Sequence, residues 1–199
     1  MPLQNRVTPF GELTIDPARG LLMGNRGGRL HDASRKLGTR RWASKQWICC
    51  QLAFNNRHRK VWGDSYSELF FLDEVTAFAA GHRPCFECRR KDAQAFAALF
   101  PGPHEAPAMD TVLHAERLDG KAKRRHRRAI DTLPDGAMIA LDDGAYTVRG
   151  HYLLRWSPSG YDKKRARPQG LQVEVLTPPS MLTVLAKGYE PLWHPSASA

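Results

Sequence analysis

FFLDEVTAFAAGHRPCFEC, residues 70–88, is the stretch of sequence around which the rest of the chain is organised. Asp73 is a favourable N-cap, because its carboxylate can accept a hydrogen bond from the first turn of a helix. Val75 and Phe78 give that helix an apolar face, and Gly81 can end it in a left-handed turn. We therefore expect a short helix that starts after Asp73 and stops at Gly81, just before a pair of cysteines.

Cys85 and Cys88 close this stretch with a C-x2-C spacing, which lets one tight turn offer two thiolates to a single zinc ion. Two further cysteines, Cys49 and Cys50, lie upstream in the run QWICCQL. Side chains of adjacent residues diverge along an extended backbone, so we expect one of these two to be a ligand and the other a buried apolar residue. Cys50 is the first choice as ligand, since apolar residues follow it on alternate positions.

The fourth coordination position of this predicted zinc site stays open at the level of sequence. A fourth protein ligand would make the zinc structural, whereas a water molecule there would make it catalytic. The candidates for a fourth protein ligand are Cys49, His58, His82 and, from further away in the chain, His31.

The run AAGHRPCFEC at 79–88, with Cys49 or Cys50 as the distant upstream ligand, resembles the metal-binding domain of the Ada DNA-repair protein. It is also similar to related small zinc modules at the ends of some nucleases. The resemblance covers about residues 45–90, and the rest of the chain does not look like the methyltransferase or regulatory parts of Ada. It implies zinc, a zinc-ribbon-like local fold and a setting in DNA repair or processing. Methyl transfer to a zinc-bound thiolate at Cys49 or Cys50 is a further possibility of that family.

The size and charge of the chain suggest what it binds. Its 199 residues fit one domain with an insertion or two small domains, and a hydrophobic fraction of 42% is enough for a core. Lys and Arg number 30 against 20 Asp and Glu, which gives a net charge of +10. Such an excess attracts polyanions, although it also serves simple solubility. We expect nucleic acid as the partner, with DNA favoured over RNA.

The N-terminus and the cysteine content indicate where the protein resides. The N-terminus has no apolar signal-peptide core, and no stretch reaches membrane-spanning length. Four cysteines in such a chain suggest a reducing compartment with metal-bound or structural thiols. We expect a cytoplasmic protein with no membrane partner.

Basic residues gather in short segments of the chain. Segment 24–32, GNRGGRLHD, combines arginines with glycines that permit close approach to a phosphate, although a set of tight turns on a surface arm fits equally well. The other segments are 35–41, 57–60, 121–128 and 163–167. We expect them to collect on one face around 24–32, with 121–128 as a phosphate-contacting loop or helix. The residues expected to contact nucleic acid are Arg26, Arg29, Arg40, Arg41, Arg59, Arg89, Arg90, Lys121, Lys123, Arg124, Arg125, Arg127 and Arg128.

Four residues are candidates for acid–base catalysis. His31 and Asp32 end the glycine-rich segment, and His114 and Glu116 stand two positions apart. On an extended segment the second pair would project to one side and could act as acid and base or as metal ligands. On a helix His114 and Glu116 face different directions, and a solvated helix face is the alternative.

Periodicity and turn signals predict the remaining elements. A helix at 89–100 carries apolar residues at the i, i+3, i+4 and i+7 spacing, and a second helix is expected at 109–118 after a break. PDG and DDG turns indicate a run of short strands, which we place at 137–141, 145–148, 151–156 and 172–176, followed by a helix that ends near 188.

The fold class that follows is α+β, with a zinc-ribbon-like cysteine cluster and short helices followed by a small antiparallel β-meander. We expect a single compact domain over 1–199, with the zinc-binding module at about 45–100 and the β-rich part at about 133–199.

The expected function is that of a zinc-containing nucleic-acid-binding protein in DNA repair or processing, with hydrolysis of a phosphodiester or glycosidic bond as the reaction that fits the available groups. The alternative is a non-catalytic, zinc-stabilised DNA- or RNA-binding regulator or accessory module. An enzyme acting on a small phosphorylated molecule would use the glycine-rich segment but leave 121–128 unexplained.

Overall fold

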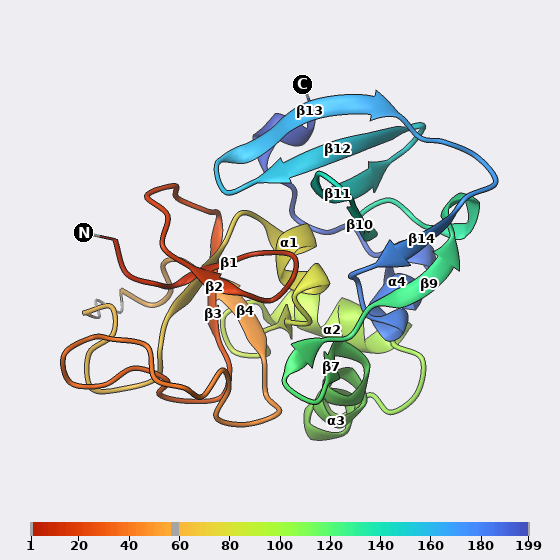
Figure 1. Ribbon diagram of the computed structural model, residues 1–199. Coiled ribbons are helices and arrows are strands. Elements are labelled where there is room, and N and C mark those ends of the chain that lie inside the picture. Colours follow the sequence, from red (N-terminus) through yellow and green to blue (C-terminus); the bar gives the residue numbers. More distant parts are fainter. Residues whose placement is uncertain (1, 57–59, 199) are drawn as a thin grey trace.

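The computed structural model describes residues 2–56 and 60–198 (Figure 1). It has an α+β fold in which two six-stranded sheets lie on either side of a short helix, α1 (Glu74–Ala79). Three further helices, α2 (Arg90–Leu99), α3 (Ala106–Arg117) and α4 (Pro179–Ala186), pack together beside α1. No helix in the described part of the chain is long and apolar enough to cross a membrane.

The first sheet is built from the N-terminal half of the chain and has the strand order β2-β1-β5-β3-β4-β6. The pairs β1/β5 and β4/β6 are parallel, and the other neighbours are antiparallel. Its strands are β1 (Arg6–Val7), β2 (Leu13–Thr14), β3 (Leu22–Asn25), β4 (Ile48–Gln51), β5 (Leu69–Phe71) and β6 (Arg83–Pro84).

The second sheet is antiparallel throughout and has the order β13-β12-β11-β10-β14-β9. It contains the predicted strands of the C-terminal part, which pair as consecutive hairpins from β10 to β13. Its strands are β9 (His126–Ala129), β10 (Met138–Leu141), β11 (Gly144–Arg149), β12 (Tyr152–Ser157), β13 (Gly160–Ala166) and β14 (Gln172–Val175). A separate ribbon pairs β7 (Leu118–Asp119) with β8 (Ala122–Lys123), and 3-10 turns occupy Ile130–Thr132 and Pro195–Ser198.

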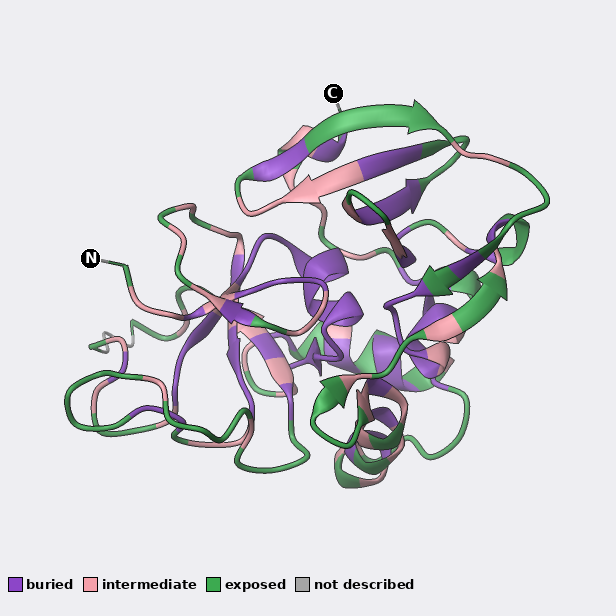
Figure 2. Ribbon diagram, viewed as in Figure 1, coloured by how far each residue is buried: buried purple, intermediate pink, exposed green. Residues whose placement is uncertain are grey.

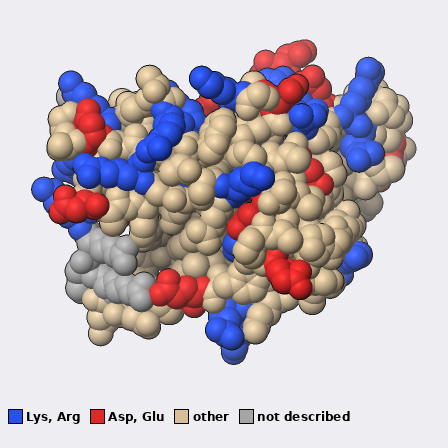
Figure 3. Space-filling model, turned by 90° about the horizontal axis from the view of Figure 1, so that it is seen from below, with Lys and Arg blue, Asp and Glu red and all other residues tan. Residues whose placement is uncertain are grey.

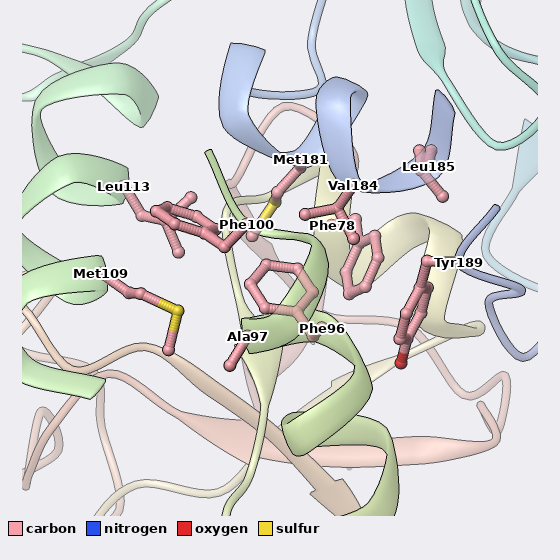
Figure 4. Close-up of a cluster of buried hydrophobic side chains, with 10 residues drawn as sticks. All are labelled: Phe78, Phe96, Ala97, Phe100, Met109, Leu113, Met181, Val184, Leu185 and Tyr189. Atoms are coloured by element: carbon pink, nitrogen blue, oxygen red, sulfur yellow. The ribbon is translucent and has the colours of Figure 1, made fainter. Parts of the chain in front are cut away.

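Helix α1 is buried on every side, and each of its six residues is inaccessible to solvent (Figure 2). Ala77 packs into the core of the first sheet, and Val75 and Ala79 pack against the second. Phe78 points into a third cluster, made with α2, α3 and α4 (Figure 4). The predicted helix is therefore confirmed, and its side chains pack against the first sheet, the second sheet and the other three helices.

The predicted helix at 89–100 is confirmed as α2, with its apolar stripe inside the cluster of Figure 4. Helix α3 begins at Ala106, earlier than the predicted 109. Pro107 is compatible with this earlier start, because the backbone N–H that proline lacks would have no helical partner in the first turn.

Three basic segments contribute residues to β-strands. Segment 24–32 begins inside the sheet, since β3 includes Gly24 and Asn25. Gly24 is required there, because a Cβ at this position would lie 2.0 Å from the carbonyl oxygen of Ile48. Segment 121–128 contains β8 and the start of β9, in place of a loop or helix, and most of 163–167 lies on β13.

Asp73 joins α1 to the C-terminal half of the chain. Its Oδ1 accepts hydrogen bonds from the backbone N of Thr76 at 2.9 Å and from the hydroxyl of the same residue at 2.8 Å. Its Oδ2 accepts from the hydroxyl of Tyr161 at 2.8 Å and from the backbone N of His194 at 3.1 Å. One buried carboxylate thus caps the helix and satisfies two donors from distant segments.

We predict that Asp73→Ala lowers the free energy of unfolding by about 2–4 kcal/mol, because it removes a helix cap and leaves buried donors without an acceptor. Asp73→Asn keeps one acceptor oxygen and should cost less. Urea unfolding measures both. Asp162→Ala, which removes a partly exposed ion pair with Arg155, is the control and should change stability by about 1 kcal/mol or less. Equal losses in the alanine variants at 73 and 162 would contradict the prediction.

Candidate metal centre

Strand β4 presents its two adjacent cysteines to opposite faces of the first sheet, as strand geometry requires. Cys49 is fully buried in the core of that sheet, beside Leu69 and Phe71. Cys50 is half-buried on the other face. The two thiols therefore have different surroundings, which is the division expected from the sequence.

The C-x2-C turn is attached to β4 by backbone hydrogen bonds. The N–H of Arg83 donates to the carbonyl of Trp47 at 3.1 Å, and the N–H of Cys85 donates to that of Cys49 at 3.0 Å. Within the turn, the N–H of Glu87 donates to the Cys85 sulfur at 3.4 Å. Parallel pairing of β4 and β6 thus holds the downstream cysteines beside the upstream strand.

Cys50, Cys85 and Cys88 form a three-thiol cluster in which all Sγ atoms lie within 4.8 Å of one another. Tetrahedral coordination at about 2.3 Å per bond requires sulfurs about 3.8 Å apart, so a small inward movement suffices. The thiols of Cys50 and Cys88 donate hydrogen bonds to Cys85 and lower its pKa, which favours a thiolate there. The cluster can hold a metal ion that prefers sulfur ligands.

Cys49 lies outside the three-thiol cluster, although it was included among the predicted metal ligands. Its sulfur accepts a hydrogen bond from Arg89 at 3.3 Å, and burial raises the pKa of its thiol. Arg89 itself is buried and bound through two N–H groups to Glu74, at 2.7 and 2.8 Å. Arg89, predicted to contact nucleic acid, is thus engaged inside the protein with Glu74 and Asp92.

The histidines considered for the fourth ligand have other partners where the structure describes them. His82 is buried, and its Nε2 accepts a hydrogen bond from Arg26 at 3.2 Å. The ring of His31 bonds to the hydroxyl of Ser67 at 2.6 Å and to the carbonyl of Gly63 at 2.9 Å. His58 lies outside the described residues. Among the residues described, no fourth Cys, His, Asp or Glu joins the cluster.

The three-thiol cluster opens onto a pocket of about 570 Å³. Glu68, which the sequence reading missed, lines the same pocket and is almost completely buried. Its Oε2 accepts from the backbone N of Trp62 at 2.8 Å, while Oε1 has no hydrogen-bond partner among residues 2–56 and 60–198. A glutamate between serine and leucine gives no local signal of burial, which is why only the folded chain reveals it.

The four candidate catalytic residues do not form one site. His31 is buried under Trp62, and Asp32 is exposed, with its carboxylate closing a local turn to Ser34 and Lys36. The other two lie on α3, where the helical alternative holds. His114 packs against Trp42, and Glu116 caps α4 through the N and Oγ of Ser180, at 2.9 and 2.7 Å.

A second hollow, here called the basic pocket, has a volume of about 560 Å³. It brings together parts of the basic segments 24–32, 35–41 and 121–128, and the sequence reading missed only Arg117, at the end of α3. Trp42 and Trp47 contribute aromatic rings, and Glu12 is the one acidic residue in its wall. Its basic lining residues are Arg26, Arg41, Arg117, Lys121, Lys123 and Arg125.

The remaining residues predicted to contact nucleic acid lie elsewhere on the surface. Arg29, Arg40, Arg90, Arg127 and Arg128 are exposed, and Arg124 is also exposed, within 3.6 Å of Asp119. Arg59 lies outside the described residues. Figure 3 shows Lys and Arg side chains in separate groups on one face of the molecule, interspersed with acidic and uncharged residues. The basic pocket brings cations from several of these segments into one hollow.

Comparison of the chain with protein-family models, with curated proteins and with solved structures finds no match. The chemistry of the site is accordingly inferred from the residues themselves.

We predict that the protein binds about one equivalent of a thiophilic divalent metal per chain, and that Cys50→Ser abolishes this binding. The matched control is Cys49→Ala, at the neighbouring position on the opposite face of β4, which should retain the metal. Metal content by mass spectrometry and the thiolate-to-cobalt absorption of the Co²⁺-loaded protein measure the outcome. Equal metal loss in folded Cys49→Ala and Cys50→Ser would exclude the three-thiol site.

Proposed function

We propose that this protein is a zinc-containing nucleic-acid-binding protein whose metal centre supports a basic pocket that holds the strand. The observation that carries the proposal is the convergence of segments 24–32, 35–41 and 121–128 at that pocket. Cations from distant parts of a chain rarely share one concavity without a polyanion to bind, because they repel one another.

Zinc is the metal that best fits the three-thiol cluster. Zinc accepts thiolate ligands in tetrahedral geometry, whereas magnesium and calcium require oxygen. The resemblance of 79–88 to the Ada metal-binding domain supports the same choice, and it favours DNA over RNA. Three protein ligands leave one position for a water molecule or for a group outside the described residues.

The metal centre and the basic pocket share one structural support. Trp47 immediately precedes β4, and its carbonyl accepts the hydrogen bond that starts β6. The guanidinium groups of Arg26 and Arg117 each lie 4.0 Å from the centre of the Trp47 ring. A metal that fixes β4 against the C-x2-C turn therefore also fixes the aromatic floor of the pocket.

The chemistry of the pocket favours an unpaired strand over a duplex. Trp42 is half-buried in its wall and offers an aromatic surface on which a base can stack. Exposed Arg41, Lys121 and Arg125 surround the pocket and can follow successive phosphates. Because such contacts bind the backbone, they position a strand without reading its sequence.

We predict that binding to a single-stranded oligonucleotide weakens with salt, by about 0.7 log units per log unit of salt for each phosphate contacted. Lys121→Gln should weaken binding and lower this slope by about that amount. Lys187→Gln, an exposed lysine after α4 outside the pocket, should leave both unchanged. Fluorescence anisotropy over a salt series measures the slopes. A slope near zero in the wild type would rule out the basic pocket as a nucleic-acid site.

A second candidate function is metal-assisted hydrolysis at the three-thiol cluster. It is favoured by the pocket that the cluster shares with Glu68, whose Oε1 is buried and has no hydrogen-bond partner in the described part of the chain. A carboxylate in such a pocket can take a proton from an attacking water, the role of a general base.

This second candidate predicts that the zinc-loaded protein cleaves a nucleic-acid substrate and that Glu68→Gln slows cleavage at least about 100-fold. The variant should keep its metal, because the glutamine oxygen can still accept from Trp62. Turnover of labelled oligonucleotides, with metal content measured on the same samples, is the test. Wild-type activity that persists in Glu68→Gln would exclude Glu68 as the base.

A further inference from the structure

Four arginines of this protein bury almost the whole side chain: Arg26, Arg83, Arg89 and Arg117 are exposed by 1%, 1%, 6% and 0%. Two of them have carboxylate partners. Arg83 binds Asp110 through two N–H groups at 2.9 and 2.8 Å, and Arg89 binds Glu74 in the same manner. The two arginines without a carboxylate are the two that line the basic pocket.

Arg26 has only neutral acceptors in the described part of the chain. Its Nε donates to His82 at 3.2 Å, and its terminal nitrogens donate to the carbonyls of Gly11 at 2.8 Å and Arg41 at 3.3 Å. His82 accepts this bond as a neutral imidazole, since burial lowers its pKa well below the usual value. No described carboxylate therefore pairs with the positive charge of Arg26.

Arg117 also forms no ion pair within the described residues, although the carboxylate of Asp110, which is paired with Arg83, lies near enough to raise the pKa of Arg117. Its terminal nitrogens donate to the carbonyl of Gly81 at 2.9 Å and to that of Lys45 at 2.7 Å. Its Nε is buried and has no hydrogen-bond partner among the residues that the structure describes. A guanidinium group stays charged and carries five N–H donors, so Arg117 retains both charge and donor capacity for a ligand.

Lys123 adds a third cation to the same pocket. Its ammonium group donates to the carbonyl of Ala79, and the residue is half-buried. Burial, and then the positive charges of Arg117 and Arg26, lower the pKa of Lys123 to about 7. Burial likewise lowers the pKa of both arginines, with Arg26 contributing to the shift at Arg117. Three like charges gathered away from solvent are unfavourable unless an anion joins them.

We propose that Arg26, Arg117 and Lys123 form a binding site for one phosphate group, in the form of a phosphomonoester at the end of a nucleotide. A phosphomonoester carries nearly two negative charges at neutral pH and several acceptor oxygens, so it matches three cations better than the single charge of a phosphodiester does.

The size and lining of the basic pocket fit a ligand larger than phosphate alone. Its volume of about 560 Å³ leaves room for a sugar and a base, and Trp42 and Phe10 lie in its wall. The phosphate group can come from a free nucleotide or from the phosphorylated end of a strand. The assignment to a strand end rests on the proposed function, whereas the phosphate site rests only on the three cations.

The test uses the wild-type protein with five probes at constant ionic strength: inorganic phosphate, a nucleoside 5′-monophosphate, the unphosphorylated nucleoside, and a short single-stranded oligonucleotide with and without a 5′-phosphate. Calorimetry and the shift in melting temperature report binding. We expect the monophosphate to bind at least about tenfold more tightly than the nucleoside, and the phosphorylated oligonucleotide more tightly than its unphosphorylated form.

Lys123→Gln tests the contribution of the third cation, because glutamine can still donate a hydrogen bond to the carbonyl of Ala79 while the positive charge is removed. It should weaken binding of the monophosphate at least about tenfold. Its unliganded form should be no less stable than the wild type, since a buried like charge has been removed. Lys187→Gln is the matched control and should bind the monophosphate as the wild type does.

The outcomes separate the phosphate site from the proposed function. Binding of phosphate and the monophosphate without binding of either oligonucleotide supports the phosphate site and overturns the nucleic-acid function. Failure of wild-type protein to bind phosphate or the monophosphate overturns the site. An affinity for the monophosphate that is unchanged in folded Lys123→Gln overturns it as well.

Discussion

The burial of α1 on all sides is the constraint on which the rest of this structure depends. A helix of six residues has many backbone groups that lack helical partners, and no water reaches them here. Asp73 satisfies the N-terminal end, and Gly81, with φ of 88°, lets the backbone turn back onto the C-terminal end. The chain leaves this turn directly into β6, so the position of the helix also determines where Cys85 and Cys88 lie.

The buried arginines of the described chain fall into two groups, those with a carboxylate partner and those without an ion pair. The ion pairs Arg89–Glu74 and Arg83–Asp110 lie beside the metal centre and are complete within the chain. Arg26 and Arg117 of the basic pocket instead donate to neutral acceptors and lie over the ring of Trp47, with no ion pair among the described residues. This contrast distinguishes the ion pairs around α1 and the thiols from the cations of the basic pocket, for which we have proposed a phosphate ligand.

Sequence reasoning succeeded where the signal is local. The helix around Val75 and the amphipathic pattern of α2 follow from caps and spacing within a few residues, as does the C-x2-C turn. The charge environment of Arg117 could not be predicted in this way. Whether a basic residue at a helix end is exposed or buried depends here on Trp47 and Gly81, which are far from Arg117 in the sequence and contact it only in the folded chain. The role of Glu116 as a cap for α4 depends equally on helix packing.

The adjacency of Cys49 and Cys50 has a consequence for assembly. A slip of β4 by one residue would exchange the two thiols, and the ion would still find a sulfur atom in reach. A metal ion alone thus cannot distinguish the correct register of β4 from a register shifted by one residue. Trp47 and Ile48 instead determine the register of β4, since a slip would expose the indole and bury the isoleucine on the wrong face of the sheet. If the cluster binds a metal, we therefore expect correct metallation to follow formation of the sheet, since earlier binding could trap a misaligned strand.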